Sequence, residues 1–190
     1  EETGKSFIEG AVKKGIDKKI ATEVFEMIKK FAAYGFNKSH SVAYSLMAYQ
    51  TAYLKANYPT EFMTANLSNE IGDTDKIVLF IDDCRKLNIT VLQPDVNESD
   101  VGFTCSGNKI RFGMEAIKNV GENAVREIIR CRTEHGKFKD LFDFCETLDL
   151  RVANKKTLES LILAGAMDSV GENRQQLFNS IERAIQYGQS

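Results

Sequence analysis

No stretch of this sequence approaches the roughly 20 consecutive apolar residues that a membrane-spanning helix needs. The N-terminus lacks the basic and then apolar segments of a secretion signal, and it also lacks an initiator methionine. We therefore expect a cytoplasmic protein with no membrane contact, cut from a longer chain. Of the 190 residues, 43% are hydrophobic and 27% are charged. This balance indicates a soluble globular protein and argues against a disordered one.

The four cysteines lack the spacing of a metal or redox site. Cys84, Cys105, Cys131 and Cys145 are far apart in the sequence, form no C-x-x-C motif and have no pair of histidines nearby. Zinc ligation and disulfide exchange both need such clusters. We predict four reduced thiols, most of them packed in the core.

The net charge of −2 is divided unevenly along the chain. Residues 1–60 hold nine lysines against six acidic residues, residues 61–115 hold five basic against ten acidic, and residues 116–190 hold eleven of each. Phosphate contacts, if the protein makes them, are therefore expected toward the two ends. A solvated surface without a charged ligand explains the same small imbalances.

The spacing of apolar residues predicts a mainly α protein. Asp17 can cap a helix in which apolar residues from Ile20 to Phe31 recur at steps of three and four, and Gly35 ends it. The helices expected after it run from Ser39 or Ser41 to about Asn57, over about 60–70, and from Asp73 or Asp75 to Asn88.

A small β element follows from Ile89. The stretches ITVLQPDVN and GFTCSGNKIRFG are rich in β-formers, and Gly107–Asn108 separates two of the runs, so a hairpin is expected over Phe103–Phe112. Pro94 restricts its strand to an edge or a bulge. After Gly113 short helical patterns resume, joined by glycine turns: MEAIKN, ENAVREIIRCRTEH, LFDFCETL, KKTLESLILA and NRQQLFNSIERAIQYG.

The turn in AIKNVGENAVREII is a candidate phosphate site. Ile117 and Val120 would close a short helix, Asn119 and Gly121 can both take positive φ, and the next helix would begin at Glu122. The amides at that helix N-terminus would then point outward. Such amides bind a phosphate and read the DNA backbone, not its bases.

The stretch SLILAGAMDSVGENRQQL repeats this arrangement. Ala164–Gly165–Ala166 forms the second turn, and the helix after it can begin with a capping box, Ser169-x-x-Glu172, or with a cap at Asn173. The two turns together resemble tandem helix-hairpin-helix motifs, which bind duplex DNA without sequence preference. Asn119 and Met167 stand where that pattern has glycine, which indicates one good hairpin and one degenerate one. A pair of αα-corners buried for packing is the alternative.

The stretch YGFNKSH at 34–40 carries more chemistry than a plain turn between helices needs, since it holds three aromatic rings, an asparagine, a lysine and a serine. Lysine and histidine can meet phosphate oxygens, and asparagine and serine can hydrogen-bond to sugar or phosphate. Aromatic rings can stack on a base. Tyr49 and Tyr53, which follow Tyr44 at helical spacing, are interpreted as core or interface residues, and Phe36 can equally be a hydrophobic staple.

Several long motifs occur in one order: YGFNKSHSVAYSLMAYQTAYLKANYPTEFM, LQPDVNES, IRFGMEAIKNVGENAV and FKDLFDFCETLDLRVANKKTLESLILAGAMDSVGENRQQL. Together they resemble bacterial replicative DNA polymerase III alpha subunits, the C family of DNA polymerases, over nearly the whole chain. The resemblance implies a helical fingers segment followed by a tandem helix-hairpin-helix module. The implied domains are 1–88 (the C-terminal part of the fingers), 89–113 (a small β connector) and 114–190 (the DNA-binding module).

The resemblance implies two binding sites and two ligands, an incoming deoxynucleoside triphosphate and a primer-template duplex. The implied nucleotide-binding residues are Tyr34, Phe36, Asn37, Lys38, Ser39, His40 and Tyr44. The predicted DNA-binding residues are Lys118, Asn119, Val120, Gly121, Glu122 and Gly165. A helical scaffold or protein-interaction module with structural αα-corners is the alternative function.

Catalysis itself is expected to lie outside this chain. The family transfers phosphoryl groups with Mg²⁺ held by palm-domain carboxylates, and that domain would precede residue 1. We expect no cofactor here, and we interpret the acidic stretches IGDTD and DVNESD as caps and turns. RQQLF at 174–178 resembles a sliding-clamp peptide, but its spacing predicts a helix. Contacts with the clamp and other replisome subunits are therefore expected outside this chain.

Overall fold

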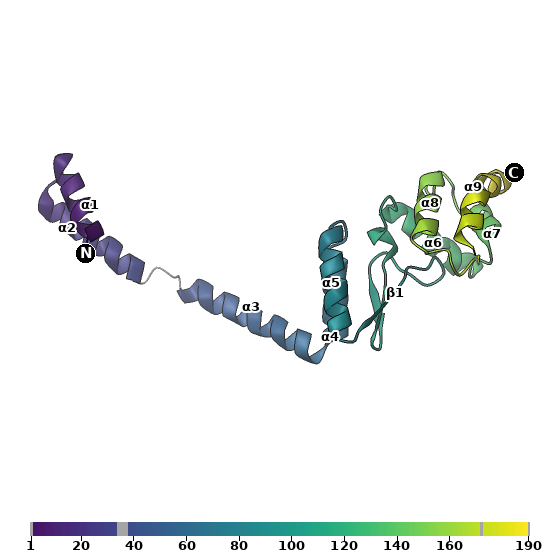
Figure 1. Ribbon diagram of the computed structural model, residues 1–190, viewed down its shortest axis with the longest axis horizontal. Helices are drawn as coiled ribbons and strands as arrows, with labels where there is room; N and C mark the ends of the chain where they lie inside the picture. The colour runs from purple at the N-terminus through teal and green to yellow at the C-terminus, as the bar shows by residue number, and fades with distance from the viewer. Residues whose placement is uncertain (1, 34–37, 172, 190) are drawn as a thin grey trace. The chain divides into compact units, whose positions relative to one another are not determined.

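The computed structural model describes residues 2–33, 38–171 and 173–189, which divide into two compact units, Glu1–Tyr53 and Leu54–Ser190 (Figure 1). The predicted fold class is confirmed, since the described residues are mostly helical with one small sheet. The boundary between the units falls at Tyr53–Leu54. The functional boundaries expected at 88 and 113 stay a prediction.

The first unit begins with a helical hairpin of α1 (Glu2–Lys13) and α2 (Lys18–Ala33). Phe7 and Phe25 pack ring to ring with centroids 5.5 Å apart, and Gly4 lies against the Phe25 ring, where a Cβ would come within 2.6 Å of it. Asp17 caps α2 as predicted, because its carboxylate accepts the amide of Lys19 at 2.8 Å. Helix α1 was not expected from the sequence.

In the described residues the apolar stripe of α2 is exposed, and α3 (Lys38–Asn57) contains no buried residue. Met27 is 63% exposed and Phe31 78%. On α3, Tyr49 and Tyr53 are 69% and 50% exposed, so their interpretation as core residues is wrong within the described chain. Their role as interface residues stays a prediction.

The second unit begins with two helices and a sheet, α4 (Pro59–Asn69), α5 (Thr74–Lys86), β1 (Thr90–Leu92), β2 (Thr104–Ser106) and β3 (Lys109–Arg111). The sheet order is β1-β3-β2, with β1 parallel and β2 antiparallel to β3. The predicted hairpin turns at Gly107–Asn108, and Pro94 follows edge strand β1 as expected. A small core joins these elements through Met63, Leu67, Ile77, Cys84, Ile89, Phe103 and Ile110.

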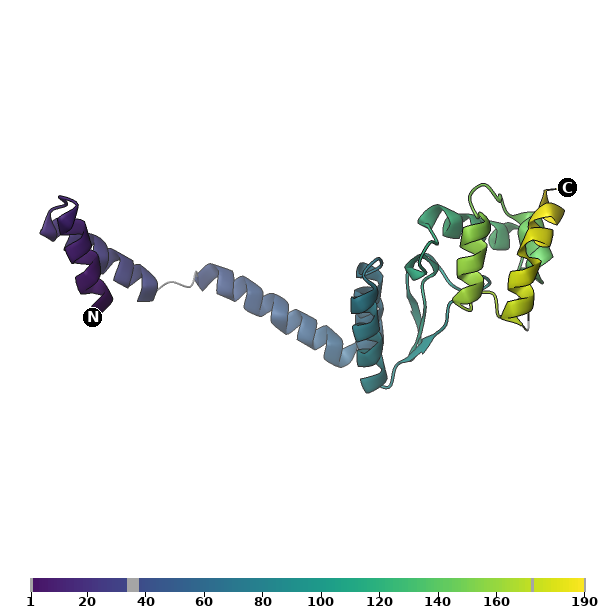
Figure 2. The same cartoon turned by 45° about the horizontal axis from the view of Figure 1, so that its top comes forward.

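The rest of this unit contains η1 (Met114–Ala116), α6 (Glu122–His135), α7 (Leu141–Thr147), α8 (Lys155–Leu163) and α9 (Arg174–Gly188). Helix α9 packs against α7 and α8, and Figure 2 shows α8 and α9 side by side. Gly188 comes so close to α7 that a Cβ on it would lie 2.2 Å from the carbonyl oxygen of Cys145. Cys84, Cys131 and Cys145 are buried and Cys105 is exposed, and all four are reduced, as predicted.

The short helix expected in MEAIKN is only one 3₁₀ turn, Met114–Ala116. Ile117 already has an extended backbone, with φ −79° and ψ 124°. Ile117 and Val120 therefore do not close a helix. Both side chains are buried and anchor the connection to the core, where tertiary packing outweighs the helical preference of so short a segment.

Candidate nucleic-acid interface

The first hairpin turn is a tight connection with an exposed tip. The Val120 amide donates to the Ile117 carbonyl oxygen at 3.0 Å, and Asn119 takes the left-handed conformation with φ +66°. Because Ile117 and Val120 are buried, Lys118 and Asn119 are held outward. The prediction that Asn119 can take positive φ is confirmed, and asparagine tolerates this region better than most residues.

Gly121 does not have positive φ, so that prediction is wrong. It is the N-cap of α6 with φ −83° and ψ 155°, the extended conformation that an N-cap takes. The turn reverses at Asn119 instead. The first helical hydrogen bond runs from the Val125 amide to the Gly121 carbonyl oxygen at 3.2 Å.

The N-terminus of α6 carries amides with no capping side chain among the described residues. In α5, α7, α8 and α9, by contrast, the side-chain oxygen of the N-cap residue accepts a hydrogen bond from an amide of the first turn. These N-cap residues are Asp73, Asp140, Asn154 and Asn173 respectively. The carboxylate of Glu122 is engaged by Arg126 one turn along, with its Nε at 2.8 Å. The first amides of α6, with Gly121 before them, therefore form a geometry that can accept a phosphate.

The first turn and the end of α8 share one surface groove. The Asn119 side-chain amide donates to the Ser160 hydroxyl at 3.5 Å, and Leu163 beside it is 68% exposed. The residues that line the groove are Pro94, Phe112, Ala116, Ile117, Lys118, Asn119, Ser160, Leu163 and Ala164. Sequence analysis identified neither Ser160 nor Leu163, because only the fold brings α8 to the first turn.

The second hairpin turn differs from the first. Gly165 is buried and has φ +81°, and the Ala166 amide donates to the Leu161 carbonyl oxygen at 2.9 Å. Asn173 caps α9 by accepting the Gln176 amide at 3.1 Å, which confirms one of the two predicted caps. Glu172, the partner in the other, lies outside the described residues. Helix α9 is amphipathic as expected, with Leu177 of the RQQLF stretch buried in the core.

The segment after Pro94 ties the second turn to the rest of the unit. Asn97 exchanges two hydrogen bonds with the backbone of Phe138, at 2.8 and 3.0 Å. The Val96 amide donates to the Ala166 carbonyl oxygen at 2.8 Å, and Arg132 donates to the Val96 carbonyl oxygen at 3.0 Å. These contacts fix the second turn relative to α6, so both hairpins belong to one rigid frame.

Glu127 holds α6 to the connection between α7 and α8. Its carboxylate accepts two hydrogen bonds from Arg130 at 2.7 and 2.9 Å, one from the Cys131 thiol at 3.4 Å and one from the Asp149 amide at 3.3 Å. The bonds from Arg130 contribute most to lowering the pKa of Glu127 to about 2. Burial, followed by the Glu127 carboxylate, raises the pKa of Cys131 to about 11, so this thiol is inert at neutral pH.

Glu127→Gln is expected to lower the free energy of unfolding by about 1–2 kcal/mol at neutral pH, because hydrogen bonds to a charged group are lost. A carboxylate with a depressed pKa stabilises the fold above its unfolded pKa, 4.5, and this contribution disappears as pH falls toward about 2. Urea unfolding of the 190-residue chain between pH 7 and pH 2 should therefore show the wild-type and variant curves converging in acid. Glu134→Gln, which removes an exposed partner of Arg130, is the control and should change stability by less than about 0.5 kcal/mol.

Three of the seven expected nucleotide-binding residues, Tyr34, Phe36 and Asn37, lie outside the described residues. The other four occupy the first two turns of α3. The rings of His40 and Tyr44 pack with centroids 4.4 Å apart, and the Lys38 carbonyl oxygen accepts the Ser41 hydroxyl at 3.0 Å. The structure therefore brings the His40 and Tyr44 rings together, and Lys38 lies at the N-terminal end of the same helix.

The described aspartates that lie close together in the sequence are engaged in ion pairs and helix caps. Asp82 pairs with Arg85 at 2.6 Å, whereas its neighbour Asp83 pairs with Lys86 at 3.0 Å and Lys55 at 3.6 Å. Asp73, in the Asp-x-Asp sequence of IGDTD, caps α5 as predicted. Across residues 2–33, 38–171 and 173–189, no three His, Cys, Asp or Glu side chains gather as metal ligands would.

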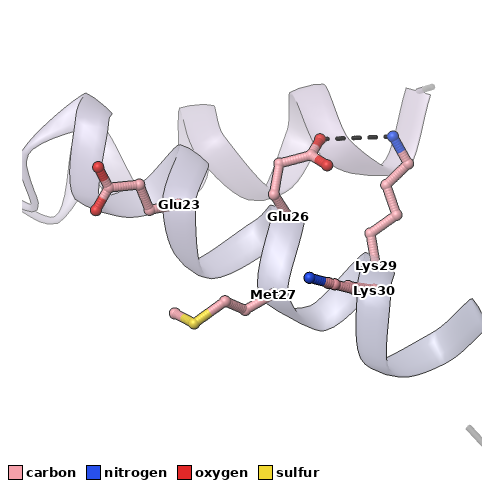
Figure 3. Close-up of a pocket in the computed structure, with 5 residues that line it drawn as sticks. All are labelled: Glu23, Glu26, Met27, Lys29 and Lys30. Carbon is pink, nitrogen blue, oxygen red and sulfur yellow. Dashed lines mark hydrogen bonds and ion pairs between the residues drawn. The ribbon is translucent and has the colours of Figure 1, made fainter. Parts of the chain in front are cut away.

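A shallow depression on α2 is lined by Glu23, Glu26, Met27, Lys29 and Lys30, all from that one helix, and Glu26 and Lys29 pair at 3.5 Å (Figure 3). Its two acidic and two basic side chains balance in number, and no residue of another described element lines it. Among the described helices, none combines the length and the apolar character needed to cross a membrane.

Comparisons with known proteins match both the hairpins and the order of motifs. A helix-hairpin-helix motif family matches residues 88–177. The chain is 48% identical over 180 residues to the DNA polymerase III subunit alpha of Borreliella burgdorferi, 46% over 180 residues to that of Vibrio cholerae and 49% over 181 residues to that of Thermus aquaticus. These matches cover 94–95% of this chain but only 15–16% of each relative. The predicted resemblance is confirmed.

Proposed function

Because the chain belongs to the DNA polymerase III alpha subunit family and matches one segment of its relatives, we propose that it contributes two binding functions to template-directed DNA synthesis. Its helix-hairpin-helix region, within 114–190, binds the backbone of the primer-template duplex without reading sequence. The beginning of α3 and the stretch before it contact the incoming deoxynucleoside triphosphate. The DNA-directed DNA polymerase activity belongs to the longer parent chain, whose palm domain would hold Mg²⁺. Contacts with the sliding clamp and other replisome subunits are made by other parts of that chain.

The uncapped N-terminus of α6 is the observation that carries the DNA-binding function. Its amides lie behind the exposed tip formed by Lys118 and Asn119, and a Cβ on Gly121 would meet nothing within 4 Å. Open space at Gly121, next to amides that no side chain caps and near a lysine, suits a phosphate. Backbone amides and a lysine do not distinguish bases, so the binding would not depend on sequence.

Gly121→Ser in the parent polymerase is expected to strengthen α6 while weakening duplex binding. A serine at the N-cap accepts an amide of the first turn, which stabilises the helix by a few tenths of a kcal/mol and fills the place of the phosphate. The space around Gly121 and its φ of −83° admit any side chain, so the fold should persist. We expect the dissociation constant for duplex DNA to rise by about threefold to tenfold, measured by fluorescence anisotropy at fixed salt.

Lys118→Ala should weaken binding on every sequence alike and reduce the slope of log affinity against log salt by about 1. Lys139→Ala, an exposed lysine outside both turns, is the control. If a folded Gly121→Ser variant and Lys118→Ala both bind duplex as the wild type does, the buried αα-corner becomes the better interpretation of this region. The alternative function, a helical scaffold or protein-interaction module, would then be favoured.

A further inference from the structure

An arginine side chain packs against the second hairpin turn at Gly165. At Gly165 a Cβ would lie 2.2 Å from a terminal guanidinium nitrogen of Arg174 and 2.8 Å from its Cζ. The guanidinium therefore packs on the glycine backbone, and the positive φ of Gly165 gives a second reason for glycine there. An arginine side chain therefore lies against the second turn, whereas a Cβ on Gly121, the N-cap of α6, would meet nothing within 4 Å.

Asp168, within the second turn, holds this guanidinium. Its carboxylate accepts the Arg174 Nε at 2.7 Å and Nη2 at 2.6 Å, the paired geometry in which arginine binds carboxylate or phosphate. Gln93 donates to the same carboxylate at 3.2 Å. The Arg174 side chain remains 47% exposed and that of Asp168 33%, so solvent and an external anion can reach the pair.

The position of Arg174 opposes the usual electrostatics of a helix. It is the first residue of α9, whose first turn contains no acidic residue, so its charge adds to the positive end of the helix dipole. Asn173 already caps the first turn of α9. The group at this helix end that can bind an anion is therefore the Arg174 guanidinium. The guanidinium at this helix end is held by one carboxylate and remains reachable by solvent, so an external anion can bind it in the place of that carboxylate.

We propose that Arg174 is a second contact to a DNA backbone phosphate, and that Asp168 occupies its guanidinium until a phosphate displaces the carboxylate. This inference rests on the proposed function, since it places the second hairpin on the same duplex as the first. The first hairpin would bind phosphate through backbone amides and the second through a side chain. The carboxylate acts as an internal competitor that lowers duplex affinity without altering either turn.

Asp168→Asn in the parent polymerase tests this directly, with Asp149→Asn as the matched control. Asp149 pairs with Arg151 through the same side-chain groups in the same unit, at 2.7–3.2 Å, and its substitution changes the net charge equally. Asp168→Asn should tighten duplex binding by about threefold to tenfold and steepen the salt slope by up to about 1. Asp149→Asn should change affinity by less than about twofold.

The Asp168→Asn/Arg174→Gln double variant tests whether the tighter binding expected of Asp168→Asn comes from a phosphate contact of Arg174 or from the loss of a negative charge. It keeps the wild-type net charge, and it should bind duplex about tenfold more weakly than Asp168→Asn alone, with a salt slope shallower by about 1. Thermal unfolding of each variant checks that the second turn persists. Arg174→Lys in the Asp168→Asn background, which keeps the charge but not the paired geometry, should give an intermediate affinity.

Two results would overturn the proposal: Asp168→Asn binding no more tightly than Asp149→Asn, or the double variant binding as tightly as Asp168→Asn. If Gly121→Ser and Lys118→Ala weaken binding in the same assay, only the role of Arg174 fails. If those variants are also without effect, it is the proposed DNA-binding function that fails.

Discussion

Purified as it stands, the 190-residue chain is expected to incorporate no nucleotide into a primer with Mg²⁺ or any other divalent metal. Phosphoryl transfer in this family requires metal ions held by converging carboxylates. In this chain Asp82 pairs with Arg85 and Asp83 pairs with Lys86, while Asp73 caps a helix. Primer extension resolved on a gel measures this nucleotide incorporation, with the parent polymerase as the positive control.

Contaminating polymerase is the main source of a false signal in that experiment. A chain carrying Lys38→Ala, purified in parallel, should give the same background as the wild-type chain. Primer extension that scales with the concentration of the purified chain and survives further purification would contradict either the family placement or the position of the palm domain before residue 1.

In the parent polymerase, Lys38→Ala and His40→Ala should each lower the catalytic efficiency of nucleotide incorporation by about tenfold to a hundredfold. Each substitution would remove a proposed charged or polar contact to the triphosphate, on the order of 1.5–3 kcal/mol for a direct contact. Both side chains lie at the exposed beginning of α3, so the helix itself should persist. Single-turnover kinetics over a range of nucleotide concentrations separates weaker binding from a slower chemical step.

Lys55→Ala and His135→Ala are the matched controls for these two variants. Lys55 lies in the last turn of the same helix and pairs with Asp83 at 3.6 Å, and His135 ends α6 in the second unit. Neither control should change nucleotide kinetics by more than about twofold. Wild-type kinetics for both Lys38→Ala and His40→Ala would show that this part of the chain has a structural role.

The sequence by itself determined the features that depend on neighbouring residues. Asp17, Asp73 and Asn173 cap helices because a carboxylate or amide oxygen reaches an amide two or three residues along. The hairpin at Gly107–Asn108 needs only a two-residue turn between two short strands. The family resemblance was equally available, because it rests on long motifs that are read in order.

Only the tertiary structure decided which residue of a turn carries the unusual backbone conformation. The sequence allowed positive φ at both Asn119 and Gly121, and the structure has it at Asn119 alone. The burial of Ile117 and Val120 fixes where the chain must reverse, and Gly121 is then left in the extended conformation of an N-cap. Local propensity cannot choose between these positions, because the choice is made by side chains that pack against α6 and the rest of the core.

Contacts between segments distant in sequence were also beyond prediction. Asn119 hydrogen-bonds to Ser160, and Phe138 hydrogen-bonds to Asn97. In each pair the two residues are 41 positions apart in the sequence. Arg174 lies near Asp168 in sequence, yet its packing on Gly165 depends on how the second turn folds back toward α9. A sequence specifies which groups are present and their local geometry. Which of them meet is decided by the packing of helices around a shared core, where burial of apolar side chains outweighs the preference of any single turn.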